Sequence, residues 1–72
     1  MNYILVTLQW NGGLEDLKVP AFVPVVELLE MFDDIYGIGG KTLQAEPKGI
    51  ILDKNKTLEE QGVQNGAKLS IS

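Results

Sequence analysis

The sequence predicts a single α+β domain in which one helix packs across a mixed sheet of four to five strands. Three observations predict this class. Apolar and polar residues alternate over the first ten positions, an apolar stripe with helical spacing follows at residues 24–36, and short apolar segments separated by turn residues fill the second half. The chain has 72 residues, of which 44% are hydrophobic and 22% are charged, which is a globular composition. We therefore expect one domain spanning residues 1–72.

The first ten residues are expected to form a β-strand with one buried face, because side chains on a strand alternate between the two faces of a sheet. Residues 11–13, Asn-Gly-Gly, are typical of a tight hairpin turn, and residues 14–19 return as a second strand with Leu17 and Val19 inward. Pro20 ends this strand because proline has no N–H group to donate. On the first strand the inward residues are Ile4, Val6, Leu8 and Trp10, and the outward residues are Tyr3, Leu5, Thr7 and Gln9.

One helix is expected between Pro24 and Gly37. Proline is well tolerated in the first turn of a helix, and glycine commonly ends a helix in the left-handed conformation. The carboxylates of this segment, Glu27, Glu30, Asp33 and Asp34, are expected on the solvent side. The apolar stripe consists of Val25, Leu28, Leu29 and Phe32, followed by either Ile35 or Tyr36.

The second half of the sequence predicts short secondary-structure elements. Residues 42–46 and 50–52 are expected to form two brief strands separated by a turn that contains proline and glycine. Thr57 and Glu60 have the spacing of a capping box, so a single helical turn is expected there. The Asn-Gly pair at residues 65–66 leads into a last strand with Leu69 and Ile71 pointing inward. A hairpin, a helix, two short strands, a helical turn and a last strand together indicate a β-grasp arrangement.

With this order of elements the chain resembles ubiquitin from its first strand to its last. The most specific part is residues 56–69, KTLEEQGVQNGAKL, which carry the threonine–leucine turn, a buried aliphatic residue and the closing strand of ubiquitin-like domains. Within that superfamily the chain is more similar to the YukD/EsaB family of bacterial type VII secretion systems. Residues 16–24, DLKVPAFVP, resemble that family's second strand, which runs into an aromatic residue, one intervening residue and a proline at the helix start.

The resemblance implies a non-catalytic cytoplasmic accessory protein that binds another protein of the secretion machinery. The implied partner is a membrane-embedded secretion ATPase, another inner-membrane secretion subunit or a regulatory protein. The chain departs from ubiquitin itself in three places. It ends Leu69-Ser70-Ile71-Ser72 without a Gly-Gly tail, and the isoleucine that anchors ubiquitin's recognition patch corresponds to Gln44 or Glu46. The last-strand valine of that patch falls near Ser72. A ubiquitin-like modifier or a sulfur carrier is therefore the disfavoured alternative.

Composition argues against several other functions. The chain has no cysteine and no histidine, so thiolate chemistry and the commonest general base are missing, and we expect neither an enzyme nor a cofactor nor a metal site. It has six lysines, no arginine and a net charge of −4, which is a poor basis for binding nucleic acid. No stretch approaches the roughly 20 apolar residues of a membrane span, and residues 1–14 do not form a signal peptide. A cytoplasmic protein without direct membrane insertion is expected.

The candidate partner-binding residues are large apolar side chains expected outside the core. The outer sheet face around Tyr3 and Leu5 is the preferred surface, because exposed aromatic and aliphatic residues often anchor interfaces. Phe22 has a structural alternative, in which its ring packs over the end of the core next to the helix. The candidates are Tyr3, Leu5, Trp10, Phe22 and Ile50.

Two interpretations remain open beside the binding module. The short edge of residues 50–52 could pair with a second copy, which would give a homo-oligomeric adaptor, and we expect a monomer or a weak homodimer. The helix carboxylates are expected to form a solvated face, with docking of a basic partner as the alternative. The glycine-rich segment 37–42 follows a helix, whereas a phosphate-binding loop precedes one, so it predicts a plain connection.

Overall fold

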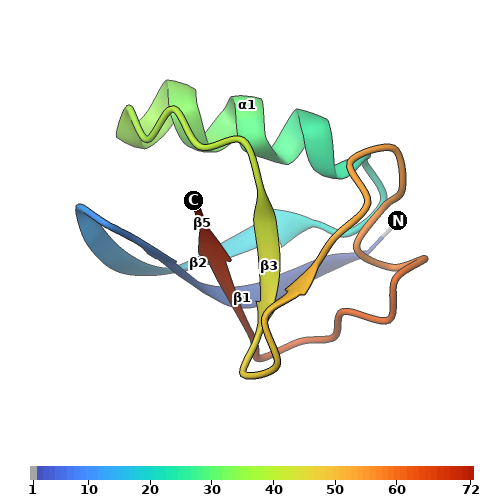
Figure 1. Cartoon of the computed structure of the whole chain (residues 1–72). Helices are drawn as coiled ribbons and strands as arrows, with labels where there is room; N and C mark the ends of the chain where they lie inside the picture. The colour runs from blue at the N-terminus through green and yellow to red at the C-terminus, as the bar shows by residue number, and fades with distance from the viewer. Residues whose placement is uncertain (1) are drawn as a thin grey trace.

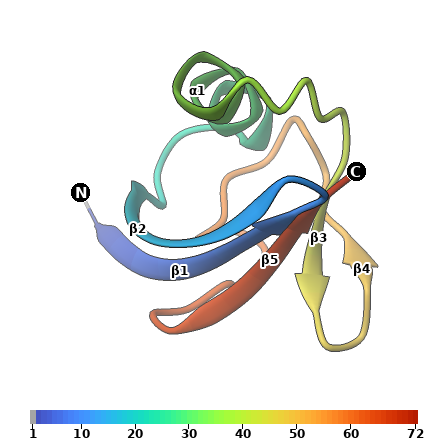
Figure 2. The same ribbon diagram turned by 90° about the vertical axis from the view of Figure 1, so that its left-hand side faces the viewer.

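A five-stranded mixed sheet carries one helix across one face in the computed structural model, which describes residues 2–72 (Figure 1). The strands lie in the order β2-β1-β5-β3-β4; β1 and β5 are parallel, and the other neighbours are antiparallel. Figure 2 shows α1 on one side of the curved sheet. The predicted α+β class and the ubiquitin-like β-grasp topology are confirmed. The elements are β1 (Tyr3–Trp10), β2 (Gly13–Pro20), α1 (Val25–Tyr36), β3 (Leu43–Glu46), β4 (Ile50–Ile51) and β5 (Ala67–Ile71).

The hairpin has the register that the alternation predicts. Tyr3 pairs with Pro20 and Trp10 pairs with Gly13. The turn therefore consists of the two residues between β1 and β2, Asn11 and Gly12. Ile4, Val6 and Leu8 are buried and Trp10 is half-buried, as expected for the inward face. The same parity leaves Tyr3 and Leu5 on the outer face, the side of the sheet opposite α1.

The helix spans Val25–Tyr36, and two details at its ends refine the prediction. Pro24 occupies the N-cap position with φ of −59°, so it precedes the first turn and does not belong to it. Gly37 ends the helix with φ of 66°, a left-handed conformation that glycine adopts without steric cost, and its N–H donates to the Asp33 carbonyl at 2.7 Å. Of the two candidates for the end of the apolar stripe, Tyr36 packs against the core and Ile35 is 62% exposed.

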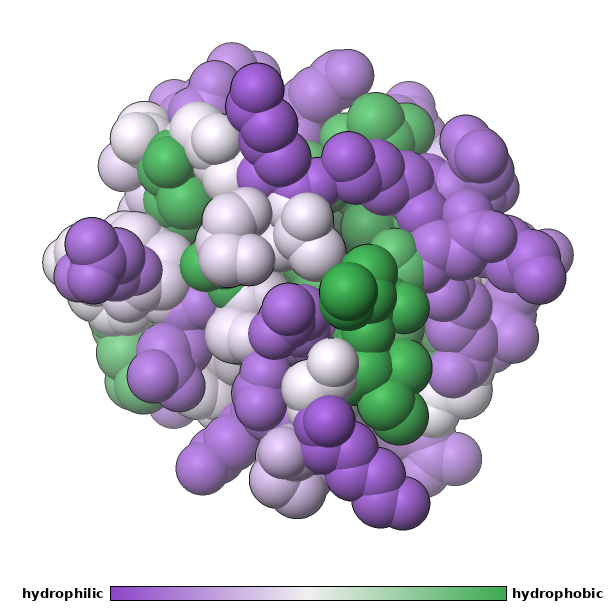
Figure 3. All heavy atoms as spheres, viewed as in Figure 1, coloured by the Kyte–Doolittle hydropathy of each residue, from purple (hydrophilic) through white to green (hydrophobic). Residues whose placement is uncertain are grey.

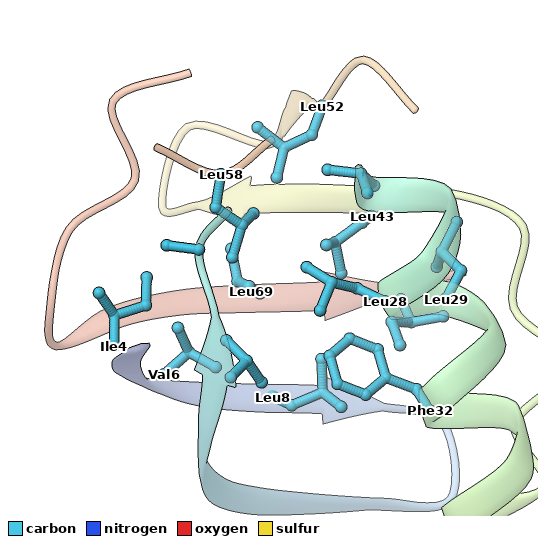
Figure 4. Packing of buried hydrophobic residues seen from close by; sticks show 14 residues of the cluster. Ile4, Val6, Leu8, Leu28, Leu29, Phe32, Leu43, Leu52, Leu58 and Leu69 are labelled. Atoms are coloured by element: carbon cyan, nitrogen blue, oxygen red, sulfur yellow. The ribbon is translucent and has the colours of Figure 1, made fainter. Parts of the chain in front are cut away.

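The core fills the space between α1 and the sheet. In Figure 4 the side chains of Leu28 and Phe32 point from the helix toward the strands, where Val6, Leu8 and Leu69 face them. Burial of these side chains is the main stabilising term available to a chain of this size. Within residues 2–72 no helix has both the length and the apolar content needed to cross a membrane. The buried residues are Ile4, Val6, Leu8, Val19, Ala21, Val25, Leu28, Leu29, Phe32, Leu43, Leu52, Leu58, Leu69 and Ile71.

At residues 57–60 the chain makes one hydrogen-bonded turn with the predicted capping box, and this turn does not continue into a helix. The Thr57 N–H donates to Glu60 Oε1 at 2.9 Å, and the Glu60 N–H donates to Thr57 Oγ1 at 3.0 Å. The chain forms a hydrogen-bonded turn here, because the Leu58 carbonyl accepts from the N–H groups of both Gln61 and Val63, which closes the segment after one turn. The turn serves the core by placing the fully buried side chain of Leu58.

Candidate protein-interaction surface

Three apolar side chains lie close to one another near the start of β1. Tyr3 is 56% exposed and Leu5 is 54% exposed, and both lie on the face of the sheet opposite α1. The Phe22 ring meets the Tyr3 ring edge to face, with 5.4 Å between the centroids and an angle of 83°. We call Tyr3, Leu5 and Phe22 the outer patch. It combines two of the residue types that most often anchor protein interfaces with an aliphatic neighbour.

The backbone under the outer patch is held by hydrogen bonds to the segment before β5. The Leu5 N–H donates to Asn65 Oδ1 at 2.7 Å, and the Leu5 carbonyl accepts from the Gly66 N–H at 2.7 Å. These bonds extend the pairing between β1 and β5 to the residues just before the start of β5. The outer patch therefore stands on ordered backbone, which lowers the entropy cost of binding through it.

Phe22 does not take the alternative role of covering the core. Its ring is half-buried against Tyr3, while the adjacent Ala21 is buried and Val23 packs against the core cluster. The residues that close the core at the entry to α1 are therefore Ala21 and Val23, which flank Phe22 in the sequence. The position of Phe22 favours the surface interpretation.

The middle of the outer face is polar. Thr7 Oγ1 donates to Asp16 Oδ1 at 2.7 Å, and Ser70 Oγ donates to Glu46 Oε2 at 2.7 Å. The register places Lys68 opposite both Thr7 and Glu46, so these residues form a polar band across the sheet. The two residues that stand for ubiquitin's central isoleucine, Gln44 and Glu46, both pair on this face, with Ser70 and Lys68 respectively. The apolar residues of this face lie at its margins.

Trp10 belongs to a different part of the surface, at the opposite end of β1. Its indole ring packs against the phenol ring of Tyr36 with 4.9 Å between the centroids and an angle of 32°. The turn glycines lie directly against the indole, since a Cβ atom on Gly12 or Gly13 would come within 3.0 Å of it. A hollow of about 510 Å³ opens here between the hairpin turn, the end of α1 and the end of β5. Its walls include Trp10, Asn11, Tyr36, Ile38, Gly40 and Ile71.

Ile50 lies on the far edge of the sheet, in the two-residue strand β4. It is 56% exposed, and the neighbouring Ile51, which sequence reasoning did not select, is 67% exposed. Figure 3 shows hydrophobic atoms gathered over β4. The five predicted residues therefore occupy three separate places, and the structure brings together only Tyr3, Leu5 and Phe22.

Sequence reasoning missed several exposed apolar residues, Ile51 of β4 among them. For Ile51 a signal existed, because a very short edge strand has neighbours on one side only and exposes both faces. Helical spacing alone leaves Ile35 and Tyr36 as alternatives for the core, and Ile35 is exposed because Tyr36 is the residue that packs against Trp10 of the hairpin. The missed side chains with at least about a third of their surface exposed are Leu14, Val26, Met31, Ile35 and Ile51.

The fold and the uncovered sheet face define a ubiquitin-like domain, and solved structures of such domains are similar to it. The ubiquitin-like domain of Arabidopsis thaliana protein At2g32350 matches with a TM-score of 0.82 and 20% identity over 100% of this chain and 78% of that chain. Caldiarchaeum subterraneum ubiquitin matches with a TM-score of 0.75 and 20% identity over 97% of this chain and 91% of that chain. A chain in the structure of protomer 1 of the ESX-3 core complex matches with a TM-score of 0.77 and 24% identity, over 99% of this chain and 16% of that chain.

The family is given by sequence. Residues 3–71 match the model of the family described as "WXG100 protein secretion system (Wss), protein YukD", and the chain belongs to this family. It is thus a ubiquitin-like domain associated with type VII secretion, which confirms the resemblance carried by residues 16–24 and 56–69. A search of curated proteins finds no significant match. Within residues 2–72 no group of three or more histidine, cysteine, aspartate or glutamate residues is arranged to hold a metal ion.

Proposed function

We propose that the protein is a non-catalytic binding module that acts as an accessory or regulatory component of a bacterial type VII secretion system. Membership of the YukD family associates the chain with secretion. The proposal places the module in the cytoplasm, where it would bind a membrane-embedded secretion ATPase or another inner-membrane subunit. The occurrence of the same fold within a larger chain of the ESX-3 core complex supports a position on or beside such machinery.

The observation that carries the proposal is the outer patch. Tyr3 and Leu5 are each more than half exposed although they belong to the longest pairing of the sheet. Their exposure is not needed by the fold, because the opposite face of β1 supplies the core. An exposed tyrosine that packs against a half-buried phenylalanine, with an exposed leucine beside it on ordered backbone, has the properties of an interface anchor. The polar band beside it would lie at the rim of such an interface.

The test is capture of the N-terminally tagged protein from detergent-extracted host membranes, with Ser72 left free. We expect the wild-type protein to enrich a secretion ATPase or a neighbouring membrane subunit, identified by mass spectrometry. The variant Tyr3→Ser/Leu5→Ser should lose most of this enrichment while its circular dichroism spectrum stays that of the wild type. The matched control is Leu14→Ser/Ile51→Ser, which removes two apolar residues that are 61% and 67% exposed at other margins of the sheet.

Three outcomes would contradict the proposal in different ways. Equal enrichment by the folded Tyr3→Ser/Leu5→Ser variant would show that the outer patch is not the binding surface. Loss of enrichment in the control variant alone would move the surface to the other margins. A ladder of covalent adducts through Ser72, or a co-purifying adenylating enzyme, would indicate a modifier or a sulfur carrier.

A further inference from the structure

We propose that Asn11 is a site of spontaneous deamidation, and that the fold protects the second Asn-Gly pair of the chain, at residues 65–66, from the same reaction. Deamidation converts the side-chain amide of Asn11 to a carboxylate in the turn between β1 and β2, at the wall of the hollow beside Trp10. This inference is independent of the proposed function and of the outer patch.

The reaction is an attack of the backbone on an asparagine side chain. The nitrogen of the next residue loses its proton and attacks Cγ, so that a bond from this nitrogen to Cγ forms, the bond from Cγ to Nδ2 breaks and ammonia leaves. Water then opens the resulting succinimide at either carbonyl and gives aspartate or isoaspartate. A following glycine favours the attack, because it has no Cβ in the way and leaves the backbone free to reach the cyclic geometry. Of the four asparagines of the chain, Asn11 and Asn65 precede glycine.

The two Asn-Gly pairs do not differ in their access to water. Asn11 and Gly12 are exposed, and Asn65 and Gly66 are exposed as well. Figure 1 shows the turn between β1 and β2 at the edge of the molecule, where the first pair lies. Because sequence and exposure are alike, any difference in reactivity comes from the hydrogen bonds that hold each pair.

Both reacting groups of the second pair are bound to Leu5. The Gly66 N–H donates to the Leu5 carbonyl at 2.7 Å, and Asn65 Oδ1 accepts the Leu5 N–H at 2.7 Å. Loss of the Gly66 proton would leave a negative nitrogen facing a carbonyl oxygen, which is unfavourable. The bond to Oδ1 also restricts the turn of the Asn65 side chain onto that nitrogen. The pair therefore reacts only after its pairing with β1 opens locally.

Neither reacting group of the first pair is held in this way. Within residues 2–72 the Gly12 N–H donates no hydrogen bond and the Asn11 side chain makes none. The Gly12 proton is consequently open to removal by water or hydroxide, and the Asn11 side chain is free to turn. The first pair can react in the folded protein without any opening of the sheet.

Deamidation of Asn11 alters the surroundings of Trp10. It adds one negative charge to a chain whose net charge is −4. The isoaspartate product also lengthens the main chain by one carbon within a turn of two residues. A Cβ atom on Gly12 would lie 3.0 Å from the indole nitrogen, so a displacement of Gly12 changes the contacts of the ring. The indole N–H resonance of Trp10, the one tryptophan of the chain, therefore reports on the reaction.

The test is incubation of the folded protein at mildly alkaline pH and body temperature, followed by peptide mapping with mass spectrometry. Fragmentation by electron transfer distinguishes isoaspartate from aspartate. We expect Asn11 to react at least about tenfold faster than Asn65, because Asn65 reacts only after local opening. In concentrated urea the two rates should come within about threefold of each other, since both asparagines then precede glycine in an unfolded chain.

Two variants and one exchange measurement check the assignment. In Asn11→Gln the attack would have to form a larger ring, so the acidic species that ion-exchange chromatography detects in aged wild-type protein should be absent. The second indole N–H signal of the aged protein should be absent too. Asn65→Gln is the matched control and should acquire both at the wild-type rate. Hydrogen exchange should be slow at the Leu5 and Gly66 amides and fast at the Gly12 amide.

Deamidation at Asn11 is overturned if this residue stays intact in the folded protein while it reacts in urea. The link to the hollow is overturned if the indole signal is the same before and after conversion. Protection of Asn65 is overturned if both sites react equally fast in the folded protein, if the ratio of their rates is unchanged in urea, or if Gly66 exchanges as fast as Gly12. None of these outcomes affects the proposed function, which is tested by capture through the outer patch.

Discussion

The indole of Trp10 packs against the phenol of Tyr36, with ring centroids 4.9 Å apart, and thereby joins the last residue of β1 to the last residue of α1. Tyr36 directly precedes Gly37, where the helix ends in a left-handed conformation. The aromatic contact therefore holds the end of the helix against the start of the hairpin turn. The same contact decides that Tyr36, and not Ile35, continues the apolar stripe of the helix into the core.

Replacing Trp10 with alanine should lower the free energy of unfolding by about 2 kcal/mol. The substitution removes a half-buried aromatic ring and its contact with Tyr36, which adds to the loss of buried area. The measurement is urea denaturation followed by far-UV circular dichroism, because the variant has no tryptophan to report by fluorescence. Leu14→Ala, a change of a 61% exposed residue of the same hairpin, is the control and should stay within about 0.5 kcal/mol of wild type. Equal losses in both variants would show that the ring contact adds nothing.

Much of the fold was predictable because local patterns and long-range packing agree. The alternation of β1 predicts which of its residues are buried, and Gly37 marks the helix end from the local sequence alone. The choice between Ile35 and Tyr36 could not be made from spacing, since both lie near the apolar stripe. It is settled by Trp10, which is 26 positions away in the sequence.

The candidate surface was predictable to a smaller extent. The parity of β1 placed Tyr3 and Leu5 outward, but the contact between Tyr3 and Phe22 depends on the path of the chain after β2. The exposure of Ile51 depends on β4 being an edge strand, which follows from strand order and not from composition. At residues 57–60 the capping hydrogen bonds were predicted, whereas the absence of a helix depends on the Leu58 carbonyl accepting bonds that close the turn.

Substituting alanine for Gly40 should destabilise the protein by about 1–3 kcal/mol. A Cβ atom at this position would overlap Cγ2 of Ile71, a buried residue at the end of β5. A double-mutant cycle measures this overlap. In the Ile71→Ala background, which lacks Cγ2, the cost of Gly40→Ala should fall by about 1 kcal/mol or more in urea titrations. Strict additivity of the two substitutions would place the cost of Gly40→Ala elsewhere, for example in backbone freedom.

The capping box can be tested by changing Thr57. Thr57→Ala removes the hydroxyl that accepts the Glu60 N–H and should lower the free energy of unfolding by about 1 kcal/mol. Thr57→Ser keeps the hydroxyl and should retain most of the stability. Thermal unfolding followed by circular dichroism is the measurement. A serine variant as unstable as the alanine variant would attribute the effect to the lost methyl group and not to the hydrogen bond.

The side chain of Gln61 holds the loop between β4 and the turn at residues 57–60, and its replacement by glutamate should be costly. Its Oε1 accepts the Asp53 N–H at 2.7 Å, and its Nε2 lies 3.1 Å from the Asp53 carbonyl and 3.2 Å from the Thr57 carbonyl. Gln61→Glu keeps the acceptor but puts a carboxylate oxygen where an N–H group had donated to carbonyls.

We expect Gln61→Glu to lower the free energy of unfolding by about 1–3 kcal/mol at neutral pH, since the hydrogen bonds that Nε2 donates to backbone carbonyls are lost and the new charge faces carbonyl oxygens. Gln64→Glu is the matched control, because it makes the same chemical change on an exposed residue whose backbone carbonyl, and not its side chain, binds the Ala67 N–H. It should alter stability by no more than about 0.5 kcal/mol. Urea denaturation of both variants gives the comparison, and hydrogen exchange at the Asp53 amide locates the effect. If that amide exchanges at the wild-type rate in Gln61→Glu, the loop is held by other contacts, with Leu52 and Leu58 in the core as the remaining anchors on either side.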